Sequence, residues 1–123
     1  YNPGPKPLSE PENQFLVKLL DKYRPGFIIS FHTWKPILNY NGECKDVAEY
    51  LHQFNSYEMA PDIGYPTPGS LGTFAVEKYH SPDRTFECPE LRQHRESLKD
   101  IWLENEKGLK GLFTTDLLWN KLK

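Results

Sequence analysis

Two side chains of this 123-residue sequence, one imidazole and one carboxylate, stand where a fold could use them for chemistry. His32 directly follows the apolar run Gly26–Phe31, and ligands in open α/β sheets bind beyond the carboxyl ends of strands. It is therefore a candidate metal ligand. Glu87 lies within the short alternating run Arg84–Cys88, where a buried carboxylate is costly unless it is paired or functional. A lone histidine after a strand is more often a hydrogen-bonded loop residue than a ligand, and a lone glutamate in a strand more often faces solvent.

The loop Ile63–Gly72 is a third candidate, because it combines three glycines and two prolines with an aromatic and two aliphatic side chains. This composition predicts a shaped loop. It is either a binding loop that presents the hydroxyl of Tyr65 or a rigid connector, and spacing does not decide between them. The dinucleotide-binding, P-loop, nucleophile-elbow and Cys-x-x-Cys motifs are all absent, and so is His-x-x-Glu.

The elements that must position these residues are helices and strands in alternation. The patterns predict helices at 9–23, 46–54, 73–79, 91–107 and 115–122, and strands at 26–31 and 84–88. Ser9 and Glu12 form a capping-box sequence at the start of the first helix. The first strand is apolar on both faces, which is typical of an interior strand. We therefore expect an α/β fold, with a mostly parallel or mixed sheet flanked by helices, and a single domain over residues 1–123.

The composition argues against several classes of protein. Fifteen basic and seventeen acidic side chains give a net charge of −2, so nothing favours nucleic acid or an anionic membrane as a partner. No apolar run reaches the ~18 residues of a membrane-spanning helix. Cys44 and Cys88 are either bridged or reduced, and two cysteines cannot build a disulfide scaffold. We expect a soluble protein whose cellular compartment the sequence does not identify, although the cytoplasm is favoured. We also expect the chain to be processed or to be part of a longer protein.

Three segments, in this order, resemble the zinc carboxypeptidase (carboxypeptidase A-like) family. The first is the helix at Ser9 with the strand that ends in Ser30-Phe31-His32, because a family strand ending in Ser-x-His delivers the third zinc ligand. The second, at 64–72, looks like the mobile loop whose tyrosine helps to hold the substrate, and its form is closest to the bacterial murein peptide amidases. The third, Arg84–Pro89, looks like the strand that carries the catalytic glutamate.

The resemblance implies a phosphorylase/hydrolase-like zinc peptidase fold, zinc as the cofactor, and a peptide or murein peptide as the substrate. It makes His32 a zinc ligand. It makes Glu87 the base that takes a proton from the attacking water and returns it to the leaving amine. It makes Tyr65 a hydrogen-bond donor to the substrate. Leu71 matches the floor of the side-chain pocket, where an aliphatic residue argues against a strongly basic substrate side chain.

The sequence also departs from this family. The first two zinc ligands of the family lie in a His-x-x-Glu segment, its substrate carboxylate is bound by an Asn-Arg pair, and neither motif occurs here. The chain therefore looks like the C-terminal part of such a domain, with the missing N-terminal half as a partner. Alone it should be inactive and bind zinc weakly, because one imidazole cannot replace about three ligands. A non-catalytic binding module and a zinc deacylase of small acylated amino acids stay open as alternatives.

Overall fold

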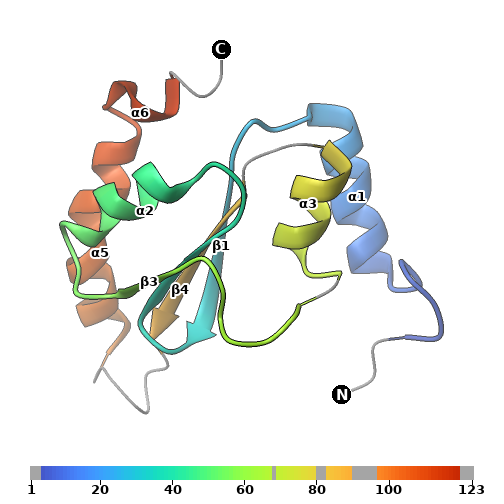
Figure 1. Ribbon diagram of the computed structural model, residues 1–123, viewed down its shortest axis with the longest axis horizontal. Coiled ribbons are helices and arrows are strands. Elements are labelled where there is room, and N and C mark those ends of the chain that lie inside the picture. The colour runs from blue at the N-terminus through green and yellow to red at the C-terminus, as the bar shows by residue number, and fades with distance from the viewer. Residues whose placement is uncertain (1–3, 68, 80–82, 90–96, 120–123) are drawn as a thin grey trace.

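A computed structural model describes residues 4–67, 69–79, 83–89 and 97–119, and at residues 33–34, 83–89 and 119 it describes the backbone alone. Figure 1 shows strands in the middle of the molecule and helices on both sides. In chain order the elements are α1 (Pro11–Tyr23), β1 (Ile28–Trp34), β2 (Ile37–Tyr40), α2 (Lys45–His52), β3 (Glu58–Ala60), α3 (Leu71–Tyr79), β4 (Asp83–Pro89), α5 (Leu98–Leu112) and α6 (Asp116–Trp119). This mixture of helices and strands agrees with the predicted α/β class.

The strands form one mixed sheet in the order β1-β4-β2-β3. β1 and β4 are parallel neighbours, β2 is antiparallel to β4, and the short β3 is parallel to β2. The two strands that the sequence predicts at 26–31 and 84–88 therefore lie side by side, which is what the α/β prediction requires.

β1 lies at the edge of this sheet, so the prediction of an interior strand is wrong for this chain. Among the described strands none pairs with its outer side, and Phe31 exposes 61% of its surface. The physical reason is that apolar side chains on both faces of a strand indicate only that other segments cover both faces. They do not show that those segments belong to the same 123 residues.

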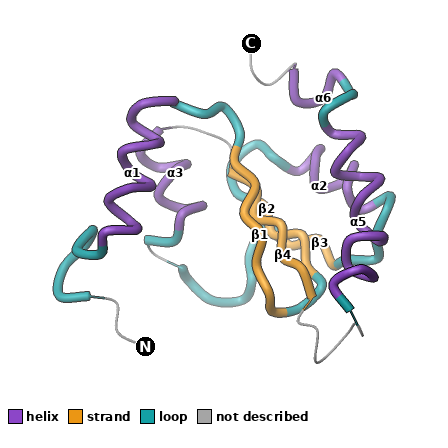
Figure 2. The backbone as a smooth tube through the Cα atoms, turned by 180° about the vertical axis from the view of Figure 1, so that it is seen from behind, coloured by secondary structure: helices purple, strands orange, loops and turns teal. Residues whose placement is uncertain are grey.

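The sheet separates two layers of helices. Figure 2 shows α1 and α3 on one side of the strands and α2, α5 and α6 on the other. The main hydrophobic core lies on the α2–α5 side, where β1 contributes Ile29 and β2 contributes Leu38. Its other buried members are Val47, Ala48, Leu51, Tyr57, Leu112 and Leu118. No helix among the described residues combines the length and apolarity needed to cross a membrane.

The first helix begins one residue later than the capping box predicts. Pro11 occupies its first turn, and the N-cap is Glu10, which makes no side-chain bond to the helix. The Ser9 hydroxyl donates to Glu10 Oε1 at 2.8 Å and does not cap the amide of Glu12. The capping-box prediction is wrong because proline, with its fixed φ and missing N–H, suits the first helical position and leaves Ser9 outside the helix.

A buried polar cluster joins α5 to the segment before β3. Asn105 is only 3% exposed, and its Nδ2 donates to the Tyr57 hydroxyl at 3.0 Å and to the Ile101 carbonyl at 2.9 Å. Asn55 donates to Asn105 Oδ1 at 2.9 Å, and the Tyr57 hydroxyl donates to Glu104 Oε2 at 3.3 Å. The side-chain amide of Asn105 thus forms hydrogen bonds with three polar groups on the α2–α5 side of the sheet.

Asn105→Ala should lower the free energy of unfolding by about 1–3 kcal/mol, because it leaves buried partners without their hydrogen bonds. Urea unfolding followed by circular dichroism measures the loss. The matched control is Asn13→Ala on the exposed side of α1, for which we expect a change within about 0.5 kcal/mol. Equal effects of the two substitutions would show that the cluster does not stabilise the fold.

Candidate functional site

The predicted metal ligand and the predicted catalytic carboxylate are neighbours in the sheet. His32 of β1 and Glu87 of β4 are Cα partners in the parallel ladder, and Ile37 of β2 is the partner of Glu87 on its other side. Because adjacent strands are about 5 Å apart, the backbones of His32 and Glu87 are separated by roughly that distance. The side chain of Glu87 lies outside the described residues, so a crevice shared by the two groups stays a prediction.

The imidazole of His32 belongs to the face of the sheet that carries α1 and α3. Ile29 packs against the core on the α2–α5 side, and strand side chains alternate between the two faces. His32, three residues further along β1, is therefore on the opposite face, where it is exposed. This places the ring within reach of a ligand that approaches from the α1–α3 side.

Of the residues that the sequence predicts to act in the site, His32 is the one suited to bind zinc. An exposed imidazole is a common zinc ligand, with a Zn–N distance of about 2.0–2.1 Å. Within the described part of the chain, no group of three or more His, Cys, Asp or Glu side chains is arranged to hold a metal ion. His32 is thus suited to complete a site whose remaining ligands have another source.

The loop between β3 and α3 is shaped by local hydrogen bonds, as its composition predicts. Asp62 Oδ1 accepts from the amide of Gly64 at 2.8 Å, and Gly64 has a φ of 93°, which a glycine adopts without strain. At the start of α3 the Ser70 hydroxyl accepts from the amide of Thr73 at 3.2 Å. These bonds hold the loop at both ends and present Tyr65 between them with 53% of its surface exposed.

Tyr65 lines a small pocket of about 210 Å³ between the end of β2 and this loop. Asn39, Asn41 and Asp62 line the same pocket. None of these three residues stands out in the sequence as a candidate for binding. The Asp-x-Gly sequence at 62–64 was a readable turn signal, but the asparagines could be placed beside the loop only once β2 was known.

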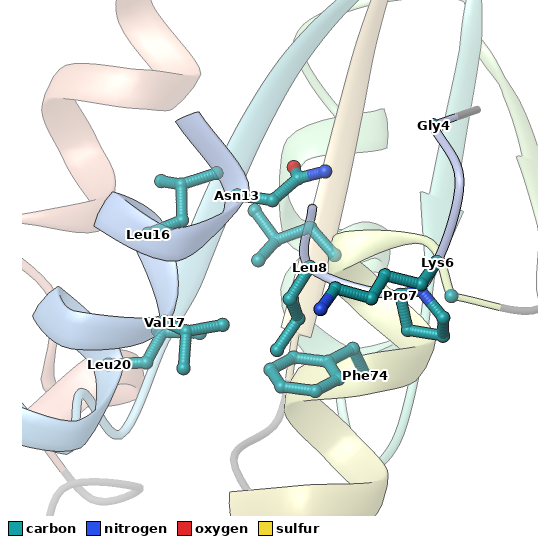
Figure 3. Close-up of a pocket in the computed structure, with 11 residues that line it drawn as sticks. Gly4, Lys6, Pro7, Leu8, Asn13, Leu16, Val17, Leu20 and Phe74 are labelled. Atoms are coloured by element: carbon teal, nitrogen blue, oxygen red, sulfur yellow. The ribbon is translucent and has the colours of Figure 1, made fainter. Parts of the chain in front are cut away.

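Leu71 lines a different and larger cavity, a groove of about 630 Å³ between α1, α3 and residues 4–8. Figure 3 shows the side chains of Leu8 and Phe74 on one side of this groove and those of Leu16 and Val17 on the other. The two residues predicted to bind substrate are therefore close in sequence but border separate cavities, one polar and one mainly apolar. Their roles in binding stay predictions.

α3 is also fastened to α1 at the C-terminal ends of both helices. Asp21 Oδ1 accepts from the Tyr79 hydroxyl at 2.8 Å and from Lys78 Nζ at 3.3 Å. The Tyr79 hydrogen bond and then the Lys78 ammonium hold the pKa of Asp21 below its ordinary value. The guanidinium of Arg24 lies 5.1 Å from the centre of the Tyr79 ring. Together, these contacts with Asp21 and Arg24 hold α3, the helix that follows the Tyr65 loop, against α1.

The chain is similar to bacterial amidases over most of its length, although no family model matches it. It is 32% identical over 74 residues to murein peptide amidase A of Escherichia coli (strain K12), a match that covers 60% of this chain and 30% of that protein. It is 34% identical over 89 residues to murein peptide amidase A of Vibrio campbellii, covering 72% of this chain and 35% of that protein. The crystal structure of murein-tripeptide amidase from Escherichia coli O157 matches with a TM-score of 0.65 and 27% identity, covering 83% of this chain and 40% of that one. The chain thus spans about a third of the length of its curated relatives.

Proposed function

We propose that this chain, a homologue of the murein peptide amidases as its three sequence segments predict, supplies part of the active site of a zinc-dependent hydrolase. The enzyme would cleave an amide bond in a peptide or murein peptide. The observation that carries the proposal is the register of β1 and β4, which pairs His32 with Glu87. A metal ligand and a general base must flank the same water, and neighbouring register positions on parallel strands meet that requirement.

The residues of the chain divide the chemistry among them. Zinc, when bound, polarises the scissile carbonyl as a Lewis acid. His32 holds one of its coordination positions. Glu87 takes a proton from the attacking water and returns it to the leaving amine, which requires a heavy-atom distance of about 2.6–3.2 Å. Tyr65 donates a hydrogen bond to the substrate from its exposed loop, and Leu71 contributes apolar contacts along the groove between α1 and α3.

The remaining zinc ligands come from the missing N-terminal half of the catalytic domain, which we place against the open edge of β1. This edge is apolar, it carries Phe31 at 61% exposure, and it directly borders His32. An apolar strand at the edge of the described sheet is a ready partner for another strand. Pairing there would complete a larger phosphorylase/hydrolase-like sheet and bring further ligands to the imidazole from its outer side.

The test uses the full-length protein that contains this chain, assayed with a murein-type peptide that ends in a free carboxylate. We expect hydrolysis of the amide bond, loss of hydrolysis with a chelator, and recovery when zinc is restored. Hydrolysis confined to an N-acyl amino acid would favour the deacylase. Binding of the peptide without turnover by the zinc-loaded protein would favour the non-catalytic module. Either result would overturn the proposal.

A further inference from the structure

The loop that carries Tyr65 is joined to the first turn of α3 by hydrogen bonds. The Thr67 carbonyl accepts from the amide of Ser70 at 3.1 Å and from the Thr73 hydroxyl at 3.4 Å. The Ser70 hydroxyl in turn donates to the Thr73 hydroxyl at 3.1 Å. Because Tyr65 is only two residues before Thr67, the position of its side chain depends on the position of the N-terminal end of α3.

The opposite end of α3 is joined to α1 through one carboxylate. Asp21 Oδ1 accepts from the hydroxyl of Tyr79, the last residue of α3, at 2.8 Å and from Lys78 Nζ at 3.3 Å. The Arg24 guanidinium lies 5.1 Å from the centre of the Tyr79 ring, and its Nε donates to the Asp21 carbonyl at 3.3 Å. We call these four residues the helix tie.

Other described contacts do little to fix the tilt of α3. Its buried residues, Gly72 and Ala75, are both small, so neither interlocks a large side chain with the layer beneath. Towards its N-terminal end a groove of about 630 Å³, lined by Leu71 and Phe74, separates α3 from α1 (Figure 3). Within the described residues, the hydrogen bonds that join α3 to α1 are those accepted by Asp21.

The length of α3 converts a small tilt at this end into a large movement at the other. With nine residues the helix is about 13 Å long, and a tilt of about 10° around its tied end moves its first residue by about 2 Å. A hydroxyl donates well only over a range of about 2.5–3.0 Å to the acceptor oxygen. A displacement of this size would therefore break a hydrogen bond between Tyr65 and a ligand.

We propose that Asp21 is a positioning residue, which holds α3 in the orientation that lets Tyr65 reach the substrate. The inference rests on the proposed function, because it takes Tyr65 to donate a hydrogen bond to the substrate. Asp21 acts through Tyr79 and α3 and has no direct part in the chemistry. The shorter of its two contacts is the one from the Tyr79 hydroxyl, so its acceptor oxygen should matter more than its charge.

The first test measures kcat/KM of the full-length protein on a murein-type peptide. Asp21→Ala should lower kcat/KM by about threefold, the scale of one exposed hydrogen bond, and Tyr79→Phe should lower it equally. Asp21→Asn should restore most of the activity, because the asparagine carbonyl oxygen still accepts from Tyr79. The matched control is Glu77→Ala, an exposed carboxylate of α3 outside the helix tie, which should leave kcat/KM unchanged.

A double-mutant cycle shows whether the effect passes through Tyr65. In a Tyr65→Phe protein, Asp21→Ala should cause no further loss of kcat/KM, because the hydroxyl that it positions is already absent. A general loss of stability would lower kcat/KM by the same factor with and without this hydroxyl. Equal losses in both proteins, or an Asp21→Asn variant as impaired as Asp21→Ala, would overturn the positioning role while the hydrolase function stands.

If the full-length protein does not cleave the peptide, the proposed function fails, and the position of the loop is tested without substrate. A fluorotyrosine is then incorporated at position 65, and its signal is recorded by fluorine NMR. A signal that shifts or broadens in Asp21→Ala, but not in Asp21→Asn or Glu77→Ala, supports the positioning of the loop by Asp21. Identical signals in Asp21→Ala and in the otherwise unmodified protein refute it.

Discussion

Glu87→Gln in the full-length protein should lower kcat by about 10²–10⁴-fold, the typical contribution of general acid–base catalysis. Glutamine keeps the shape of the side chain and its capacity for a hydrogen bond, but it cannot accept the proton of the attacking water. Zinc content and the binding of substrate should therefore stay close to those of the unmodified protein. Steady-state kinetics on a murein-type peptide, together with metal analysis of the same preparation, measure both quantities.

Tyr65→Phe is the comparison that gives this result its meaning. Loss of the hydrogen bond from this one hydroxyl costs about 0.5–1.5 kcal/mol, which corresponds to roughly a tenfold decrease in the rate of hydrolysis. The loss with Glu87→Gln should exceed the loss with Tyr65→Phe, because only the carboxylate moves a proton. Near-normal turnover of Glu87→Gln would show that this glutamate is an ordinary strand residue.

His32→Ala should weaken zinc binding by the full-length protein by more than about 100-fold. Substitutions that only orient a ligand already cost 10–100-fold in metal affinity, and loss of a ligand itself should cost more. Elemental analysis after dialysis against a zinc buffer measures the effect. This chain alone, in contrast, should bind zinc weakly before and after the substitution, because it offers one imidazole where a catalytic site needs about three protein ligands.

His52→Ala is the matched control for metal binding. His52 is also exposed, and it lies at the end of α2, on the opposite side of the sheet from α1 and α3. Its Nδ1 is 2.8 Å from the Tyr57 carbonyl. His52→Ala should leave the zinc content unchanged. Stoichiometric zinc in His32→Ala, or equal losses in both variants, would mean that the histidine of β1 is not the ligand.

The sequence predicted the described helices and the two longer strands, and it missed the two shorter strands. α1, β1 and β4 lie where the patterns predict, within about three residues at each end. β2 and β3 were missed because strands of four and three residues carry too little pattern to separate them from a loop. They exist as strands because β2 pairs with β4, and such pairing is invisible in the local sequence.

A glycine explains the misplaced end of α5. The prediction ends this helix at Lys107, before Gly108, whereas the helix continues to Leu112. Gly108 is buried against α2 and its following turn, and a Cβ there would come within 3.0 Å of Phe54 and 3.3 Å of Leu51. The glycine is thus needed for close packing between helices and does not end one. The predicted start at Leu91 lies outside the described residues, which enter the helix at Leu98 after the N-cap Ser97.

The candidate site shows the same division between residue type and arrangement. His32 and Glu87 could be chosen from the sequence because each follows or interrupts an apolar run, but their shared register depends on strand pairing. The grouping of Asn39 with Asp62 depends on the same pairing, because it brings the end of β2 beside the Tyr65 loop. Motif order could not show that Tyr65 and Leu71 border different cavities.

Anomalous diffraction at the zinc absorption edge, from crystals of the full-length protein, would locate the metal relative to His32 and Glu87. We expect a single strong peak about 2.0–2.1 Å from a ring nitrogen of His32, with further ligands from outside this chain. The carboxylate of Glu87 should lie on the same face of the sheet, one water away from the peak. A zinc peak remote from His32, or a Glu87 carboxylate on the opposite face of the sheet, would contradict the account.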